Sequence, residues 1–190
     1  MGEPASGYMF TDMQVVESLQ AKDANAFRSL VERLEQPIIG YLHRLVGDHE
    51  VALDLAQDTF LQVYKEIGKM PLDISLNAWI YRIATNYGLR YLNRKKLRSF
   101  IHLDTSEDYH PCFAVEGPEE QAETRILVEQ ALRSLKPEDA ACLQLHYGDG
   151  FTYEEIGQIL QLSTEAVRKR VSRGVTKFRA TYGMAPGKRM

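Results

Sequence analysis

The chain has 190 residues and a formal net charge of −3, with 44% hydrophobic and 26% charged residues. This composition is globular, with room for one domain or two small ones, and the negative charge excludes a uniformly basic nucleic-acid coat. The two cysteines are too few for a disulfide framework.

The first half of the chain predicts a bundle of helices. Residues 1–10 are small and polar and are expected to be disordered. A short helix to about residue 20 follows, and Asp23 can cap a longer helix that Gly47 ends. Pro37 should kink or split that longer helix. Its apolar positions recur at helical spacing: Phe27, Leu30, Val31, Leu34, Ile38, Leu42 and Leu45.

Two further segments complete this half. Asp48 can cap the helical segment 51–67, and residues 68–77 read as a loop that contains Pro71. The helix of residues 78–98 then combines aromatic, amide and cationic side chains. Its expected buried stripe is Ile80, Ile83, Ala84, Tyr87 and Tyr91.

A second stripe of residues 78–98 should face away from that core. No Asp or Glu occurs from Ile74 to Leu103, and the helix ends in a cluster of cations. Cations neutralise phosphates, aromatics stack on unpaired bases and amides read base edges. The segment is therefore a candidate to hold opened nucleic acid, although a basic helix end and core aromatics explain the same residues. The second stripe is Trp79, Arg82, Asn86 and Asn93.

The middle of the chain reads as a linker. Residues 99–124 contain seven acids and no Lys or Arg, and residues 99–117 lack hydrophobic periodicity. Cys112 lies here, and with His110 it lacks the further ligands that a zinc site needs. By contrast, the chain from Ala166 onward has eight cations and no acid. Two basic surfaces joined by an acidic linker are typical of a chain that grips a polyanion at two places.

The last third predicts a helix-turn-helix. Pro118 can open a helix to Leu135, and Pro137 can open another that ends at Gly148. The segment TYEE from Thr152 is a capping box, and the short helix behind it leads through a tight turn into a longer basic helix. Ile156, Ile159, Leu160 and Leu162 should pack against Val167, Val171 and Phe178. This packing turns Glu165, Lys169, Ser172 and Thr176 outward, flanked by Arg168 and Arg173.

The ordered set of segments resembles bacterial sigma factors of the extracytoplasmic-function type, in the sigma-70 family. DLAQDTFLQVYKEI resembles region 2.2, AWIYRIATNYGLRYLNRKK resembles regions 2.3 and 2.4, and residues 135–174 resemble region 4. The resemblance covers roughly residues 12–182. It implies an all-α protein of two helical domains joined by a flexible acidic linker. The implied divisions are a region 2 bundle at 11–98, a linker at 99–117, a region 4 helix-turn-helix at 118–183 and a tail at 184–190.

The resemblance also implies a function and a set of partners. Such a protein directs core RNA polymerase to promoters, reads the −35 duplex, opens the −10 element and catalyses no reaction. Its region 2.2 helix docks on the clamp helices of the largest polymerase subunit, and its region 4 meets the flap of the second largest. Promoter DNA and, in many relatives, an anti-sigma factor complete the partners. The docking residues carried over are Asp54, Gln57, Asp58, Leu61 and Tyr64.

The DNA contacts are carried over in the same way. The family's base-contacting Asn maps to Asn86, and Trp79 and Tyr81 are equally consistent with a purely structural role. The implied −10 set is Trp79, Tyr81, Arg82, Asn86, Asn93, Arg94, Lys95, Lys96 and Arg98. The implied −35 set is Glu165, Arg168, Lys169, Ser172 and Arg173.

Departures from the family pattern limit what can be carried over. Arg90 stands where relatives often have Asp, and Glu165-Ala166-Val167 replaces a G-T-V at the start of the recognition helix. Glu165 can accept from a cytosine amino group or repel phosphate, so the promoter sequence cannot be copied. The acidic linker is equally consistent with entry into the polymerase cleft and with a bare tether.

Two rival functions remain. A helix-turn-helix repressor or activator would use the last domain alone and leave the first domain unexplained. A helical enzyme would need a nucleophile–base pair, a phosphate loop or a metal cluster, and the sequence shows none. No cofactor or metal is expected. A signal peptide and a membrane-spanning run are also not apparent, so a cytoplasmic location is expected.

Overall fold

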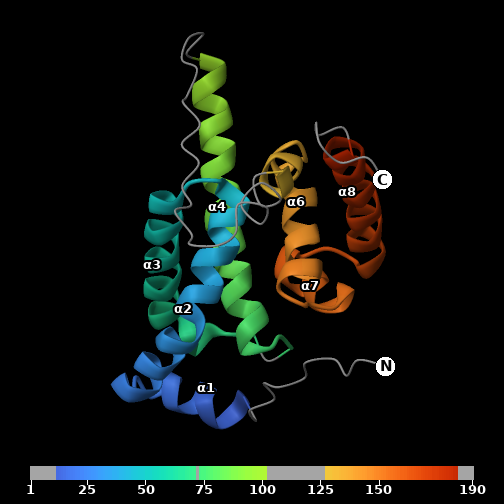
Figure 1. The fold of residues 1–190 in the computed structure, drawn as a ribbon. Helices are drawn as coiled ribbons and strands as arrows, with labels where there is room; N and C mark the ends of the chain where they lie inside the picture. The colour runs from blue at the N-terminus through green and yellow to red at the C-terminus, as the bar shows by residue number, and fades with distance from the viewer. Residues whose placement is uncertain (1–11, 72, 102–126, 184–190) are drawn as a thin grey trace, which may run out of the picture.

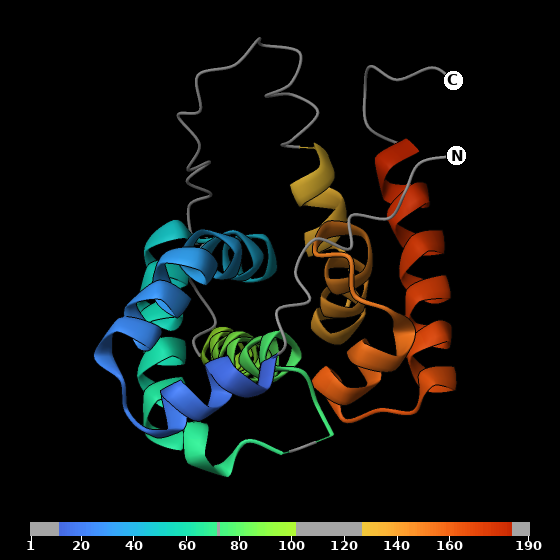
Figure 2. The same ribbon diagram turned by 90° about the horizontal axis from the view of Figure 1, so that it is seen from below.

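All regular structure in the described residues is helical, as the sequence predicts. The computed structural model describes residues 12–71, 73–101 and 127–183. Two groups of helices lie side by side, one built from the N-terminal half and one from the C-terminal half (Figure 1). The long helix α4 stands between them in the view along its axis (Figure 2). The expected all-α, two-domain architecture is confirmed.

The first domain contains four α-helices whose ends follow their capping residues. Asp23 accepts hydrogen bonds from two backbone N–H groups of the next turn, and Asp48 accepts one from Val51. Gly47 takes the left-handed conformation with φ +77° after the second helix, which a side chain would disfavour. The elements are α1 (Asp12–Gln20), α2 (Ala24–Val46), α3 (His49–Glu66), the 3₁₀ turn η1 (Ile67–Lys69) and α4 (Leu76–Ile101).

Pro37 does not split the second helix, contrary to one of the expected outcomes. α2 runs without interruption from Ala24 to Val46 with Pro37 inside it. Pro37 is exposed, so the carbonyl that loses its usual N–H partner four residues earlier can bond to water instead. The helix is then held by its buried face, where Leu30, Ile38 and Leu42 are almost fully covered.

The second domain contains the predicted helix-turn-helix. Residues 127–133 are helical and are followed by α6 (Pro137–Leu143), a π-helical turn η2 (Gln144–Gly148), α7 (Tyr153–Leu160) and α8 (Thr164–Gly183). The predicted capping box is present, since Thr152 and Glu155 exchange side-chain-to-backbone hydrogen bonds at the start of α7. Ile156, Ile159, Val167 and Val171 are buried together, as the helical phase predicts.

α4 is buried on more sides than its predicted stripe. Ile80 and Ala84 are buried as expected, but Ile83, Tyr87 and Tyr91 are only half-buried. Trp79 and Tyr81, which lie off that stripe, are buried as well. The first half of α4 packs against α2 and α3 on one side and against α7 on the other. A helix covered on two sides has no single apolar stripe, which explains the difference.

Several predictions fall on residues that the structure does not describe. These are the disorder expected for residues 1–10, most of the linker with Cys112, the start of the helix expected from Pro118, and the tail. α4 continues to Ile101, three residues beyond the boundary expected at residue 98. Among the described residues, no helix is long and apolar enough to cross a bilayer. Within the same ranges, no three potential ligands from His, Cys, Asp and Glu are grouped to hold a metal ion.

Candidate protein and nucleic-acid interfaces

One apolar groove lies between α2 and α3 of the first domain. This α2–α3 groove has a volume of about 610 Å³. Leu61 and Tyr64, two of the predicted docking residues, line it and remain 50% and 43% exposed. Gln57 lines it too, and Asp54 and Asp58 are exposed on the same helix. Large exposed apolar side chains around a groove are typical of a protein-binding surface.

Tyr64 is held in position at the rim of the α2–α3 groove. Its ring packs edge-on against Phe27 with 5.0 Å between the ring centroids. The ammonium of Lys22 lies over the Tyr64 ring, 4.3 Å from its centroid, and donates to the Tyr64 backbone carbonyl. These contacts fix an aromatic side chain at the surface without burying it, as a rigid binding anchor requires.

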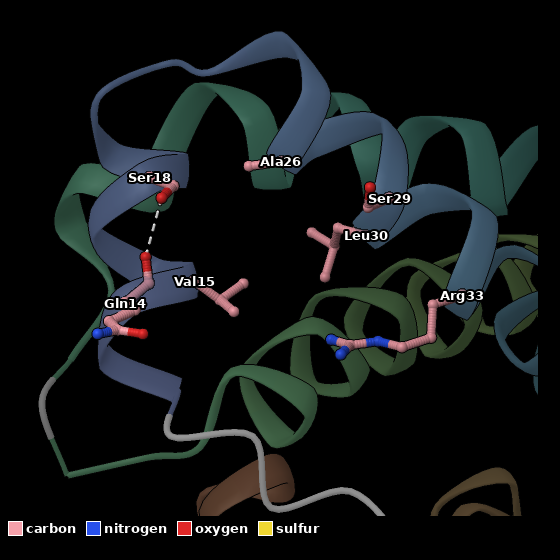
Figure 3. A pocket seen from close by; sticks show the side chains of 7 residues that line it. All are labelled: Gln14, Val15, Ser18, Ala26, Ser29, Leu30 and Arg33. Carbon is pink, nitrogen blue, oxygen red and sulfur yellow. Dashed lines mark hydrogen bonds between the residues drawn. The ribbon is translucent and has the colours of Figure 1, made fainter.

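A second hollow lies between α1 and α2. It has a volume of about 320 Å³ and is lined by Val15, Ala26 and Leu30, with the Arg33 guanidinium extending across it (Figure 3). Ser18 bonds to the backbone carbonyl of Gln14 on its wall. The Nε atom of Arg33 is buried without a hydrogen-bond partner in the structure. None of the predicted site residues lies in this hollow.

The predicted −10 residues divide along α4 into a covered group and an exposed group. Trp79 and Tyr81 are buried, and Arg82 is half-buried. Further along the helix all members are exposed. The second domain contacts α4 at Tyr81 and Arg82, through Asp149 and the Gln158 carbonyl. The exposed members are Asn86, Asn93, Arg94, Lys95, Lys96 and Arg98.

Two members of the covered group, Tyr81 and Arg82, are hydrogen-bonded to the second domain. Arg82 donates from Nε and Nη2 to the backbone carbonyl of Gln158 in α7, at 3.0 and 2.6 Å. The Tyr81 hydroxyl donates to Oδ1 of Asp149 at 3.1 Å, and its ring packs on Phe151 with centroids 4.8 Å apart. Burial and the Asp149 carboxylate raise the pKa of Tyr81 well above its usual value. Tyr81 therefore remains a protonated donor.

Asp149 receives a cation as well as the tyrosine. Nη2 of Arg44, on α2, donates to both carboxylate oxygens of Asp149, at 2.9 and 3.1 Å. Burial nevertheless raises the pKa of Asp149, because the loss of hydration outweighs the attraction of Arg44 and the hydrogen bonds. Asp149 is therefore a desolvated carboxylate that joins α2, α4 and the turn before α7.

All five predicted −35 residues are exposed on α8, but the Arg173 guanidinium is paired with the buried Asp139 of α6. Glu165 forms ion pairs with Arg168 at 3.0 Å and Lys169 at 3.6 Å on the same helix. Lys169 and Ser172 are exposed, as the helical phase predicts. The Glu165 carboxylate thus partly neutralises the first turns of the basic helix, and any phosphate or base contact there competes with it.

Sequence reasoning missed Arg44, Asp149, Gln158 and Leu53. The first three act between domains, and no periodicity links residues so far apart in the chain. Leu53 is an exposed apolar residue in the α2–α3 groove. Its spacing of four and eight residues from Gln57 and Leu61 places it on their face, and this signal was available in the sequence.

Comparisons with known proteins match both domains in order. Residues 30–98 match the family described as Sigma-70 region 2, and residues 131–180 match Sigma-70, region 4. The RNA polymerase sigma-H factor of Pseudomonas aeruginosa is 30% identical over 171 residues, covering 85% of this chain and 89% of that protein. The ECF RNA polymerase sigma-E factor of Escherichia coli strain K12 is 29% identical, covering 86% and 90%.

Solved structures share the fold. The sigma factor RpoE in complex with the anti-sigma factor NepR, from Bartonella quintana, has a TM-score of 0.66 at 19% identity, covering 83% of this chain and 97% of that one. CnrH in complex with the cytosolic domain of CnrY has a TM-score of 0.68 at 21% identity, covering 90% and 96%. At these identities the likeness extends to the arrangement of helices.

Proposed function

This chain belongs to the sigma-70 family of RNA polymerase sigma factors, in its extracytoplasmic-function group. We propose that three of its surfaces bind core polymerase, the opened −10 strand and the −35 duplex. Its function is promoter-specific initiation of transcription with core RNA polymerase. The observation that carries this conclusion is the match of both regions, in order, within a chain that is 30% identical to a named sigma factor over most of both lengths.

The α2–α3 groove is the proposed docking surface for core polymerase. It offers Leu61 and Tyr64 as exposed apolar anchors, and Asp54 and Asp58 add exposed negative charge on the same helix. An apolar anchor beside charged groups suits a partner helix with apolar and cationic side chains. The proposed partner is the pair of clamp helices on the largest polymerase subunit.

The exposed polar side chains of α4 between Asn86 and Arg98 are the proposed surface for the opened −10 strand. Asn86 offers an amide that can pair with a base edge, and the cations from Arg94 to Arg98 can neutralise phosphates. Stacking on aromatic side chains then offsets the cost of unstacking bases, which is a few kcal/mol. Trp79 is buried in the core, and Tyr81 and Arg82 can join this surface only when the second domain releases them.

The outward face of α8 is the proposed reader of the −35 duplex. The cap of α7 and the turn at residues 161–163 present α8 as the second helix of a helix-turn-helix, which is the helix that enters a major groove. Arg168, Lys169 and Ser172 are exposed there. The second domain also suits the flap of the second largest subunit as a partner.

In this proposal the chain is a specificity subunit, and the polymerase forms the bonds of the RNA. It acts in the cytoplasm, where polymerase and chromosome are found. We also propose an anti-sigma partner for it, supported by the two solved relatives, which are described in complex with such partners or with a cytosolic domain. Their identities of 19% and 21% do not identify that partner.

The test is reconstituted transcription with purified core polymerase and genomic fragments. The full chain should produce transcripts from a limited set of start sites, and core polymerase alone should not. Lys169→Ala should weaken initiation at promoters that depend on the −35 element. Lys177→Ala is the matched control, because it removes an exposed lysine from the same helix outside the predicted set. Failure to bind polymerase and to initiate at specific sites would overturn the proposed function.

A further inference from the structure

A third hollow lies in the second domain, between α6, α8 and the helix of residues 127–133. This α6–α8 pocket has a volume of about 410 Å³, which is within the usual range for small-molecule sites. Arg44, on α2 of the first domain, contributes to one side of it, and none of the predicted site residues is among those that line it. Apolar side chains make up most of its wall: Val128, Leu132, Leu143, Val175 and Phe178.

The charged groups that line the α6–α8 pocket are cationic. They are Arg44 and Arg179, and no Asp or Glu is among the lining residues that the structure describes. Arg44 is already paired with Asp149 through Nη2. Arg179 is exposed, and none of the described residues pairs with its guanidinium. One cation is therefore left for a ligand, and a single carboxylate complements it.

Two lining side chains each carry a buried polar atom that has no hydrogen-bond partner within the described residues. These atoms are Oε1 of Gln144 and Nε of Arg44. Gln144 is only 4% exposed, and its Nε2 donates to the Arg44 backbone carbonyl at 3.2 Å. Because buried polar atoms are almost always paired, an unpaired acceptor beside an unpaired donor indicates a place for a polar group of a ligand. An amide supplies both partners, since its N–H donates and its carbonyl accepts.

The backbone at Gln144 has a form that often accompanies binding sites. The π-helical turn η2 begins at this residue, and the backbone N–H five residues further on donates to its carbonyl at 3.0 Å. Such turns are rare and occur frequently at functional sites. The turn brings Gly148 and Tyr147, which is 68% exposed, to the pocket. A Cβ at Gly148 would lie 3.3 Å from Nη2 of Arg44, so glycine lets the guanidinium approach closely.

We propose that the α6–α8 pocket binds a small amphiphile of the N-acyl amino acid class, which has an apolar chain, one amide and one carboxylate. The chain lies against Val175 and Phe178, and the carboxylate pairs with Arg179. The amide bonds to Gln144 and Arg44, and the Gln144 side chain turns on binding because Oε1 is covered in the free chain. The pocket lies apart from the surfaces assigned to polymerase and DNA, so this inference goes beyond the proposed function and does not depend on it.

Isothermal titration of the full chain with N-octanoylglycine tests the pocket. The wild-type chain should bind one molecule with saturation. Decanoate, which has a chain and a carboxylate but no amide, should bind at least tenfold more weakly. Octylamine should not bind, because its cation would face Arg179.

Three variants assign the parts of the ligand. Arg179→Met should weaken N-octanoylglycine at least tenfold, and Lys177→Met is its matched control, because it removes an exposed lysine of the same helix that does not line the pocket. Val175→Trp should abolish binding by filling the apolar space. Gln144→Leu should remove the advantage of N-octanoylglycine over decanoate. Circular dichroism and thermal unfolding establish that each variant is folded.

The outcomes separate this inference from the proposed function. Absence of saturable binding to the wild-type chain overturns the inference, and so does binding that folded Arg179→Met and Val175→Trp variants leave unchanged. Equal affinity of the wild-type chain for N-octanoylglycine and decanoate overturns the assigned ligand class. Each of these results leaves polymerase-dependent transcription without added ligand intact, whereas loss of promoter-specific initiation rejects the proposed function itself.

Discussion

Arg173 on the recognition helix forms a two-pronged ion pair with Asp139 on α6. Its Nε donates to Oδ2 at 2.8 Å and its Nη2 to Oδ1 at 2.5 Å. Asp139 is only 4% exposed, and the pair raises the pKa of Arg173 above its ordinary value. Arg173 therefore also links α8 to α6 within its own domain, although the helical phase placed it on the flank of the DNA-binding face.

We predict that Arg173→Ala lowers stability as well as −35 binding. It leaves the buried Asp139 carboxylate without its cation, which is costlier than losing an exposed pair. The melting temperature of the full chain should fall by about 3–6 °C. The measurement is thermal unfolding followed by circular dichroism.

A double-mutant cycle provides the control for this ion pair. Asp139→Ala should destabilise the chain, and the double variant Asp139→Ala with Arg173→Ala should lose less than the sum of the two. Additive losses would show that the pair contributes nothing to stability. Discrimination between −35 sequences, measured separately, should fall roughly tenfold with Arg173→Ala if the guanidinium also reads a base.

The α2–α3 groove yields a prediction about polymerase binding. Leu61→Asp places a charge on an apolar surface that is exposed in the free chain but covered in the proposed complex. Affinity for core polymerase should fall more than tenfold, as measured by pull-down or fluorescence anisotropy. The free energy of unfolding should change by no more than about 0.5 kcal/mol, since exposed sites tolerate substitution.

Leu97→Asp is the matched control for that groove. Leu97 is another exposed leucine, at 60%, but it lies on α4 outside the groove. It should leave polymerase affinity unchanged. Equal losses from the two variants would mean that the α2–α3 groove is not the docking surface.

His43 predicts a dependence of stability on pH. Burial, followed by the charges of His49 and Arg133, lowers the pKa of His43 in the folded chain. An unfolded histidine has a pKa of about 6.5, so the unfolded chain takes up this proton first as the pH falls. The contribution of neutral His43 to the free energy of unfolding is fully present above a pH of about 6.5 and declines below it. The loss is up to about 1.4 kcal/mol for each unit by which the folded and unfolded pKa values differ.

Urea unfolding at pH 7.5 and 5.5 measures this dependence, and His43→Gln should reduce it. Arg133 supplies a further check, because it donates to the Gly47 carbonyl at 2.8 Å from the second domain. Arg133→Ala should raise the pKa of His43, as observed in an NMR titration. An unchanged His43 titration in that variant would contradict the assigned role of Arg133.

Local structure could be predicted from the sequence because its causes are local. The caps at Asp23, Asp48 and Thr152 depend on residues within one turn, and all three form as predicted. The helix-turn-helix packing depends on a short apolar period and is confirmed in the same way. The family resemblance added the order of the domains.

The arrangement of the domains could not be predicted from those patterns. Trp79 and Tyr81 are aromatic positions that the sequence leaves open between core and DNA, and tertiary packing buries both. Tyr81 packs on Tyr41 of α2 and on Phe151 of the second domain. The acceptors Asp149 and Gln158 lie more than sixty residues further along the chain. Their partners follow from tertiary contacts, which no helical period encodes.

Asn86 gives the sharpest prediction about the opened strand. Its side chain is exposed, so Asn86→Ala should leave the free energy of unfolding within about 0.5 kcal/mol of wild type. Binding to polymerase and to the −35 duplex should also be retained. Selection of one −10 base should weaken by about 1–3 kcal/mol, because the amide that pairs with a base edge is lost.

Initiation assays on promoters substituted at each −10 position measure this selection. Asn25→Ala is the control, since it removes an exposed asparagine from the first turn of α2, outside every proposed surface. The comparison with Arg82→Ala is informative as well. Arg82 is bound to the second domain, so its loss should both expand the free chain and weaken strand binding, whereas Asn86→Ala should affect the strand alone. An unchanged preference at every −10 base in the Asn86 variant would remove this residue from the proposed base site.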